Sequence, residues 1–282
     1  MKIGIHAYAW CSVWSNETLH LIDRAKGLNM DLIEIPLMRL ELFDTQQVRK
    51  RLRDAGLGSC TSTVLLEGMD LTSEDREERR RAVRYLKDCV AATAEIGATH
   101  FSGVIYSRHV KPAVRRPDSA VWEMAAEGLR EVAEHADSLG VIIGLEPVNR
   151  YETYLINTAE QALKLVKMIG ADNVGIHLDT YHMNIEEKSF SDAVRTAADK
   201  LIHIHLCEND RGIPGTGLVD WEDLFAALGE IQYRGNAALE SFVDITDNMN
   251  TWVWRQLAKD GDTLVSEGTS FIRSMQRKYR LA

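Results

Sequence analysis

The stretch VIIGLEPVNRYETYLINTAEQALKLVKMIGADNVGIHLD, residues 141–179, decides the fold. It begins and ends with short apolar runs, 141–146 and 174–179, which predict two buried strands. Between them, Thr158 precedes a helical pattern that runs to Ile169 and is followed by Gly170. Thr before a helix and Gly just after it are residues that cap helices. The stretch therefore predicts a strand–helix–strand unit of a parallel sheet.

The same alternation runs along the whole chain. Further helical patterns cover Glu74–Ile96, Ala120–Leu139 and Trp221–Leu228, and Gly97, Gly140 and Gly229 mark helix ends. The eight predicted strands are Lys2–His6, Leu32–Ile35, Ser59–Val64, His100–Ile105, Val141–Glu146, Val174–Asp179, Leu201–Leu206 and Ala237–Glu240.

Eight such units without a Pro/Gly/Ser-rich linker predict an α/β fold. We expect a single (β/α)8 TIM barrel domain over residues 1–282, with an extended C-terminal helical segment at Asn250–Arg280. An open doubly wound sheet is the competing architecture, but no G-x-G-x-x-G follows the first strand.

The composition excludes several classes of protein. The 282 residues carry 33 basic and 42 acidic side chains, a net charge of −9, which argues against a nucleic-acid partner. The basic run at 79–84 follows SEDREE (73–78) and fits an exposed helix face. No apolar run reaches the ~18 residues of a membrane span. Four scattered cysteines without a C-x-x-C pair, and no visible signal peptide, predict a cytoplasmic protein with reduced thiols.

Four polar residues end four successive predicted strands: Glu146, Asp179, His205 and Glu240. The C-terminal ends of the strands in a parallel barrel converge on one mouth, so these side chains are expected to meet there. Three carboxylates and one imidazole suit Mn²⁺, Co²⁺, Mg²⁺ or Zn²⁺. A single carboxylate at a strand end more often caps the next helix, but four potential ligands at the ends of successive strands favour a metal site.

Histidines and aromatic residues provide further candidates. His177 and His203 point to the same inner face as the ligands, one layer deeper, either as their supports or as satisfied interior side chains. Aromatic residues after the first strand, including Trp14, could form the apolar wall of a ligand pocket, with core packing the alternative for Trp10. Tyr106, like Arg108, follows the fourth strand and is a candidate for the pocket rim.

Four segments resemble the D-tagatose 3-epimerase family of ketose 3-epimerases, a branch of the xylose-isomerase-like barrels. They are EPVNRYETYLINT (146–158), HLDTYHMNIEE (177–187), HIHLCENDRGIPGTG (203–217) and LESF (239–242). The resemblance implies one divalent ion at the four strand-end residues, with Mn²⁺ expected and Co²⁺ or Mg²⁺ possible. It also implies a homodimer or homotetramer, for which Trp252 and Trp254 are candidate contacts.

The same resemblance implies which residues contact a sugar. Glu152, His182 and Arg211 match the positions that hold the ketose near its C1–C3 oxygens. Cys60 falls where the family lines its pocket, and a small buried hydrophobe is the equal alternative. His6 stands where the family often has an aromatic residue, which leaves its substrate contact open.

For Arg211, the alternative to a substrate contact is a salt bridge within its own loop, with Glu208 or Asp210.

The expected reaction is metal-dependent epimerisation at C3 of a free ketose such as D-tagatose, D-fructose/D-psicose or L-ribulose, through a cis-enediolate. Glu146 and Glu240 are the expected acid–base pair. Alternatives on the same scaffold are an aldose–ketose or hydroxypyruvate-type isomerase and a sugar-phosphate epimerase. Endonuclease chemistry would need more ligands at strands two to four, where Glu34 is the one comparable group.

Overall fold

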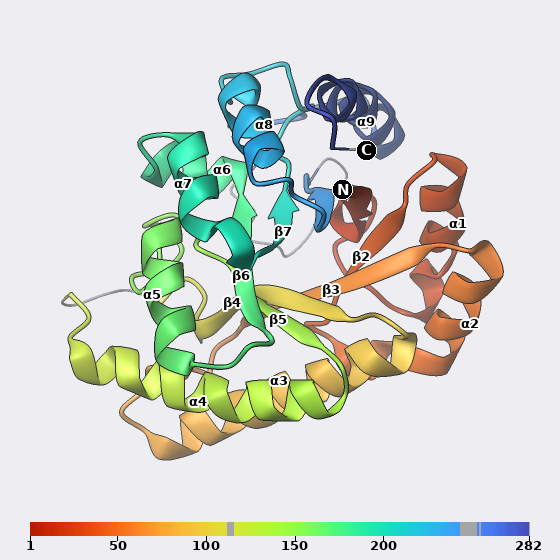
Figure 1. Cartoon of the computed structure of the whole chain (residues 1–282). Helices are drawn as coiled ribbons and strands as arrows, with labels where there is room; N and C mark the ends of the chain where they lie inside the picture. The colour runs from red at the N-terminus through yellow and green to blue at the C-terminus, as the bar shows by residue number, and fades with distance from the viewer. Residues whose placement is uncertain (112–115, 243–252, 254, 282) are drawn as a thin grey trace.

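The computed structural model describes residues 1–111, 116–242, 253 and 255–281. Among them, eight parallel strands pair in chain order, and β8 pairs with β1, so the sheet closes into a barrel (Figure 1). The strands are β1 (Lys2–His6), β2 (Leu32–Pro36), β3 (Gly58–Leu65), β4 (His100–Arg108), β5 (Ile142–Leu145), β6 (Val174–Asp179), β7 (Leu201–His205) and β8 (Asn236–Leu239).

Helices connect the strands and cover the outside of the barrel (Figure 1). They are α1 (His20–Gly27), α2 (Thr45–Ala55), α3 (Arg76–Ile96), α4 (Ser119–Ser138), α5 (Ala159–Ile169), α6 (Thr180–Glu186), α7 (Phe190–Ala197), α8 (Trp221–Glu230) and α9 (Gly261–Lys278). Short 3₁₀ turns lie at Ala7–Ala9, Asn16–Thr18, Leu40–Leu42 and Ala198–Lys200. No described helix is long and apolar enough to cross a membrane.

The predicted barrel is confirmed, and each predicted strand is present with its ends shifted by no more than a few residues. Thr158 caps α5 as expected, and Gly97 and Gly170 end α3 and α5 in the left-handed conformation. Gly229, in contrast, lies inside α8.

The C-terminal helix begins later than the predicted Asn250. It starts at Gly261, where the Asp260 side chain accepts a hydrogen bond from the Thr263 backbone amide at 2.7 Å. This N-cap fixes the start of α9, and 255–260 form no helix. Trp252 and Trp254 lie outside the described residues.

The first strand and the last helix are joined. The amino group of Met1 donates a hydrogen bond to the Leu281 carbonyl (2.8 Å), and the Gln276 side-chain amide donates to the Met1 carbonyl (2.7 Å). The two chain ends accordingly lie close together in Figure 1. Helix α9 is thereby fastened to β1, beside the β1–β8 pair that closes the barrel.

A close approach between β3 and β4 shapes one side of the barrel mouth. Val64 pairs with Val104, but Leu65 pairs with Arg108, so the register shifts there and Arg108 is moved up beside the end of β3. Gly103 precedes the shift with φ +128°, and a Cβ atom at this position would stand 2.1 Å from the Thr63 carbonyl oxygen. The backbone here therefore requires glycine.

We predict that Gly103→Ala destabilises the protein more than Gly68→Ala. Both glycines have positive φ, at +128° and +81°, but a Cβ atom at Gly68 would meet no atom within 4 Å. The control therefore carries the backbone strain alone, on the order of 1–3 kcal/mol, whereas Gly103→Ala adds a backbone clash. Urea unfolding of the two variants measures the difference, and equal losses of unfolding free energy would contradict the clash.

Candidate active site

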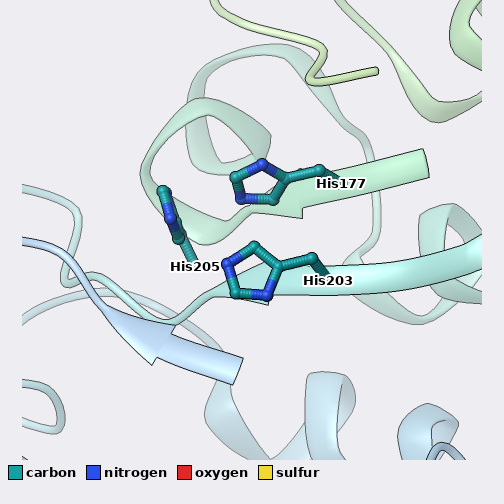
Figure 2. Close-up of side chains that lie close together, drawn as sticks. All are labelled: His177, His203 and His205. Carbon is teal, nitrogen blue, oxygen red and sulfur yellow. The ribbon is translucent and has the colours of Figure 1, made fainter. Parts of the chain in front are cut away.

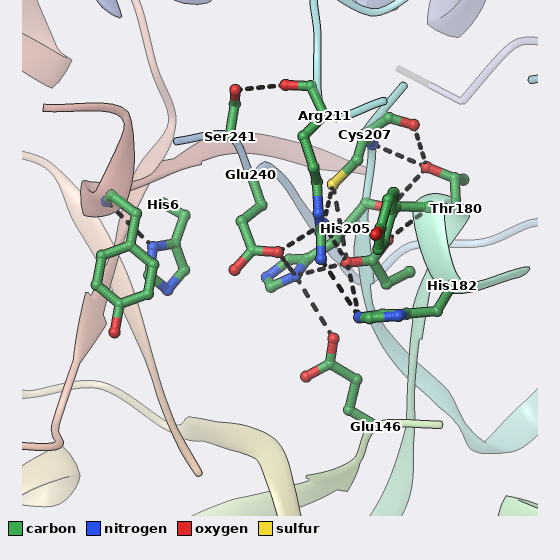
Figure 3. A network of polar contacts seen from close by, with 12 residues as sticks. His6, Glu146, Thr180, His182, His205, Cys207, Arg211, Glu240 and Ser241 are labelled. Atoms are coloured by element: carbon green, nitrogen blue, oxygen red, sulfur yellow. Dashed lines mark hydrogen bonds and ion pairs between the residues drawn. The ribbon is translucent and has the colours of Figure 1, made fainter. Parts of the chain in front are cut away.

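The four expected ligands lie together at the C-terminal ends of β5 to β8. Figure 3 shows three of them, Glu146, His205 and Glu240. The Nδ1 atom of His205 lies 3.5 Å from Asp179 Oδ2 and 3.4 Å from Glu240 Oε2. The same nitrogen lies 3.8 Å from Glu146 Oε1. No more than 11 % of any of these side chains is exposed. Three carboxylates thus surround one imidazole nitrogen inside the protein.

Asp179 also caps the helix that follows its strand, which was the alternative role for a carboxylate at a strand end. Its Oδ1 atom accepts a hydrogen bond from the Tyr181 backbone amide at the start of α6 (2.7 Å). Its Oδ2 atom faces His205. One carboxylate therefore caps the helix and contributes to the cluster at the same time.

Arg211 neutralises two of the three carboxylates. Its Nη1 atom lies 2.7 Å from Asp179 Oδ2 and 2.7 Å from Glu240 Oε2. Burial would raise the pKa of Asp179, but Arg211 and His182 outweigh it and hold this pKa well below its ordinary value. Burial opposes ionisation of Glu240 too, yet Arg211 and His205 lower its pKa.

Glu146 is left without such compensation. Burial raises its pKa well above the ordinary value, and although His205 opposes this, the charges of Asp179 and Glu240 add to it. A further positive charge beside Glu146 would remove the penalty. The cluster therefore fits a cation electrostatically.

The imidazole of His205 also fits a metal ligand. Its Nε2 atom lies 3.0 Å from Glu34 Oε2, and its Nδ1 atom has no hydrogen-bond partner among the described residues. Burial would lower the pKa of His205, but the Glu34 and Glu240 carboxylates raise it well above its usual range, as expected beside so many anions. A cation that replaces the Nδ1 proton would find three carboxylates and one imidazole, a donor set that suits Mn²⁺, Co²⁺ or Mg²⁺.

A cavity of about 750 Å³ opens above this cluster. Glu146 and Glu240 form part of its lining, together with the predicted sugar contacts Glu152, His182 and Arg211. The structure thus brings the two carboxylates expected to act on the substrate and the three residues expected to hold it into one pocket.

Glu152 and His182 are held in place by their neighbours. The Asn149 side-chain amide donates to Glu152 Oε1 (2.8 Å), and the Asn149 backbone amide donates to His182 Nδ1 (3.1 Å). His109 Nε2 lies 2.9 Å from Glu152 Oε2. Burial would raise the pKa of Glu152, but His182 and His109 lower it to about 2, so this carboxylate is a permanent acceptor.

Four aromatic side chains line the pocket. Trp14, expected from the sequence, lines it together with Tyr8, Tyr181 and Phe242. Trp10 does not line it, because its indole N–H donates to Asp262 at the start of α9 (3.0 Å). The packing alternative for Trp10 is therefore confirmed.

Arg211 is not used in a salt bridge within its loop. Glu208 accepts hydrogen bonds from backbone amides such as Gly215 N (2.9 Å), and Asp210 pairs with Arg255. The backbone of Arg211 has φ +66°, and its carbonyl accepts a hydrogen bond of 2.5 Å from the Ser241 hydroxyl. The guanidinium lies over the Tyr181 ring at 4.1 Å from its centroid.

Three expected sugar contacts do not reach the pocket. Tyr106 is fully buried, and its hydroxyl donates to the carbonyls of Glu146 (2.9 Å) and Ile156 (3.1 Å). Cys60 is buried with its sulfur 3.6 Å from Glu34 Oε2, and His6 Nε2 lies 3.1 Å from the Ser62 hydroxyl. These side chains support the barrel interior, whereas Arg108, the last residue of β4, lines the pocket.

The sequence analysis did not identify several residues that contribute to the site. His109 and Asn149 hold Glu152, and Phe242 and Tyr181 each stand two residues after an expected ligand. That spacing was the available signal for the two aromatic residues. Glu34, a charged residue inside an apolar strand, was visible as an interior polar group, but its contact with His205 was not.

Comparisons with known proteins agree with this geometry. The model of the xylose isomerase-like TIM barrel family matches residues 22–275. The chain is 36 % identical to a ketose 3-epimerase of Arthrobacter globiformis over 281 residues, covering 97 % of this chain and 96 % of that protein. It is 35 % identical to an L-ribulose 3-epimerase of Mesorhizobium japonicum over 276 residues, covering 96 % and 93 %.

The structure of the chain also resembles a solved structure. The D-allulose 3-epimerase from a Methylomonas species superposes with a TM-score of 0.94 at 34 % identity, and the match covers 98 % of each chain. The chain therefore belongs to the xylose isomerase-like TIM barrel family and, within it, to the ketose 3-epimerases.

Proposed function

We propose that the protein interconverts the C3 epimers of a free ketose of the D-psicose, D-tagatose or L-ribulose type. The relatives named above as ketose 3-epimerase and L-ribulose 3-epimerase support the reaction class. The observation that carries the proposal is that Glu146 and Glu240, from the ends of β5 and β8, line one cavity beside His205.

The chemistry requires two groups that exchange protons with C3. A proton alpha to the C2 carbonyl is removed from one face, and a proton is returned to the other face through a cis-enediolate. Glu146 and Glu240 come from different strands, so each can serve one face without the sugar turning over. General acid–base catalysis of this kind contributes about 10²–10⁴-fold.

Glu146, Asp179, His205 and Glu240 would hold a divalent cation, which we propose is Mn²⁺, with Co²⁺ or Mg²⁺ as substitutes. When bound, it supplies positive charge that stabilises the negative charge developing on O2 of the sugar. The same four side chains are fixed by burial and by their neighbours Arg211 and Glu34, so the protein holds them in place before the substrate arrives.

The remaining pocket residues would orient the sugar. The Arg211 guanidinium can donate to oxygens near C1–C3, His182 lies within 3.3 Å of Arg211 Nη2, and Glu152 accepts from a sugar hydroxyl. The rings of Trp14 and Phe242 form the apolar wall for the far carbons.

The deciding experiment is proton NMR in D₂O with purified protein, Mn²⁺ and a panel of free ketoses. Deuterium entering at C3 together with the C3 epimer is the expected result, and the fastest sugar identifies the preferred substrate. Deuterium at C1 with formation of an aldose would favour the isomerase instead. Turnover of sugar phosphates alone would overturn the assignment to free ketoses.

We predict that Glu146→Gln and Glu240→Gln each lower epimerisation by about 10²–10⁴-fold while the protein remains folded. Each change removes a proton-transfer group from the cavity. Glu186→Gln is the matched control, because Glu186 pairs with Arg150 and does not line the cavity. Epimerisation rates and circular dichroism are the measurements, and full activity of either cavity variant would exclude the two-carboxylate mechanism.

Arg211→Ala is expected to lower kcat/KM by about 10–100-fold, the effect of losing a charged hydrogen-bond donor. Bound Mn²⁺ should not decrease, because the loss of this cation leaves Asp179 and Glu240 more negative. Kinetics and metal analysis of the same preparations test both statements. Loss of Mn²⁺ with unchanged kinetics of the reloaded protein would contradict the substrate role.

We further propose a homodimer or homotetramer, as the sequence resemblance implies, and a cytoplasmic location, as the four scattered cysteines suggest. Light scattering after size-exclusion chromatography measures the oligomeric state, and a monomer at micromolar concentration would overturn that part.

A further inference from the structure

A buried carboxylate lies beneath the proposed cation site. Glu34, in the middle of β2, is completely inaccessible to solvent. Its Oε2 atom lies 2.7 Å from His203 Nε2 and 3.0 Å from His205 Nε2. The Cys60 sulfur lies 3.6 Å from the same oxygen, and His6 Nε2 lies 3.8 Å from Glu34 Oε1.

Burying a carboxylate in this way lowers the stability of the folded protein, so Glu34 calls for a functional explanation. An ionised group loses its hydration inside a protein, and replacing a buried ion pair by apolar side chains is often neutral or stabilising. Glu34 Oε1 has no hydrogen-bond partner among the described residues, so even its own bonding is incomplete. Stability of the barrel does not account for this residue.

The hydrogen bonds of Glu34 decide where the imidazole protons lie. An ionised carboxylate only accepts, so both His203 and His205 must carry a proton on Nε2. The lone pair of a neutral His205 is then on Nδ1, the atom that faces Glu146, Asp179 and Glu240. The opposite tautomer would place an N–H group at the centre of the cluster and leave no lone pair there for a cation.

Packing holds the same ring in its plane. His177 and His203, from β6 and β7, lie against His205, as Figure 2 shows. The ring centroids of His177 and His205 are 4.1 Å apart, in an edge-to-face contact. His203 also makes an edge-to-face contact with His205, at 5.2 Å between ring centroids, so both neighbouring rings support the plane of His205.

We propose that Glu34 is a positioning residue that fixes His205 in the Nε2–H tautomer and so presents Nδ1 to the divalent cation. The proposal rests on the cation site proposed above. Glu34 does not line the cavity, so it acts on the cation through His205 and has no contact with the sugar. Carboxylates that bond to metal-bound histidines raise metal affinity about 10–100-fold in general.

The test is the affinity for Mn²⁺ of Glu34→Gln, measured from the electron paramagnetic resonance signal of free Mn²⁺. Glutamine keeps the shape, and its oxygen can still accept from both imidazoles, which bond to one oxygen of Glu34, but it lacks the negative charge that strengthens the two hydrogen bonds and makes the His205 ring a stronger donor to the cation. We expect Mn²⁺ binding to weaken by about 10–100-fold. Asp70→Asn is the matched control, because Asp70 is equally buried and paired with Lys111 but lies away from the cluster.

The outcomes separate this proposal from the proposed function. If the wild-type protein binds no Mn²⁺, the cation site fails and this proposal fails with it. If the wild-type protein binds Mn²⁺ and Glu34→Gln binds it equally well, only the role of Glu34 is overturned. An equal loss in Asp70→Asn would also overturn it, because any buried carboxylate would then have the same effect.

A second measurement does not depend on the folding of a variant. Long-range ¹H–¹⁵N correlation spectra of the wild-type histidine side chains report which ring nitrogen carries a proton. We expect a proton on Nε2 of His205 in both the metal-free and the Mg²⁺-saturated protein, with the signals assigned by their absence from His205→Gln. A His205 Nε2 without a proton would overturn the proposal.

Discussion

The crowding of three carboxylates around one imidazole nitrogen is the constraint on which the rest of the site depends. Glu146, Asp179 and Glu240 all lie within 4 Å of His205 Nδ1 and are shielded from water. Like charges at this distance repel strongly in a buried setting, so the protein must supply positive charge from nearby. Arg211, from the loop after β7, provides it for two of the three.

Much of this site could be predicted from sequence because the barrel topology does most of the positioning. Once eight parallel strands close in chain order, any residue at the C-terminal end of a strand must face the same mouth. The proximity of Glu146 and Asp179 could therefore be predicted from their positions at the ends of apolar runs, without knowing which atoms they contact. The same reasoning could be applied to His205 and Glu240.

Contacts that depend on register or on neighbouring side chains could not be predicted. The sequence indicated Tyr106 and Arg108 alike for the pocket rim, but both lie in β4. There, beside the register shift, Arg108 lines the pocket, and the Tyr106 hydroxyl bonds to buried backbone carbonyls. The contact between Glu34 and His205 joins residues 171 positions apart on strands that are not neighbours, and no local pattern reports it. The start of α9 depended on the cap at Asp260, which outweighed the helical pattern before it.

The left-handed backbone of Arg211 has a consequence for ligand recognition. A non-glycine residue at φ +66° is strained by about 1–3 kcal/mol, and the hydrogen bond from Ser241, the neighbour of Glu240, helps to hold it. The guanidinium is also enclosed by the Tyr181 ring and two carboxylates. Its conformational entropy is therefore lost when the chain folds. Binding of a sugar to this hydrogen-bond donor then costs little further side-chain entropy.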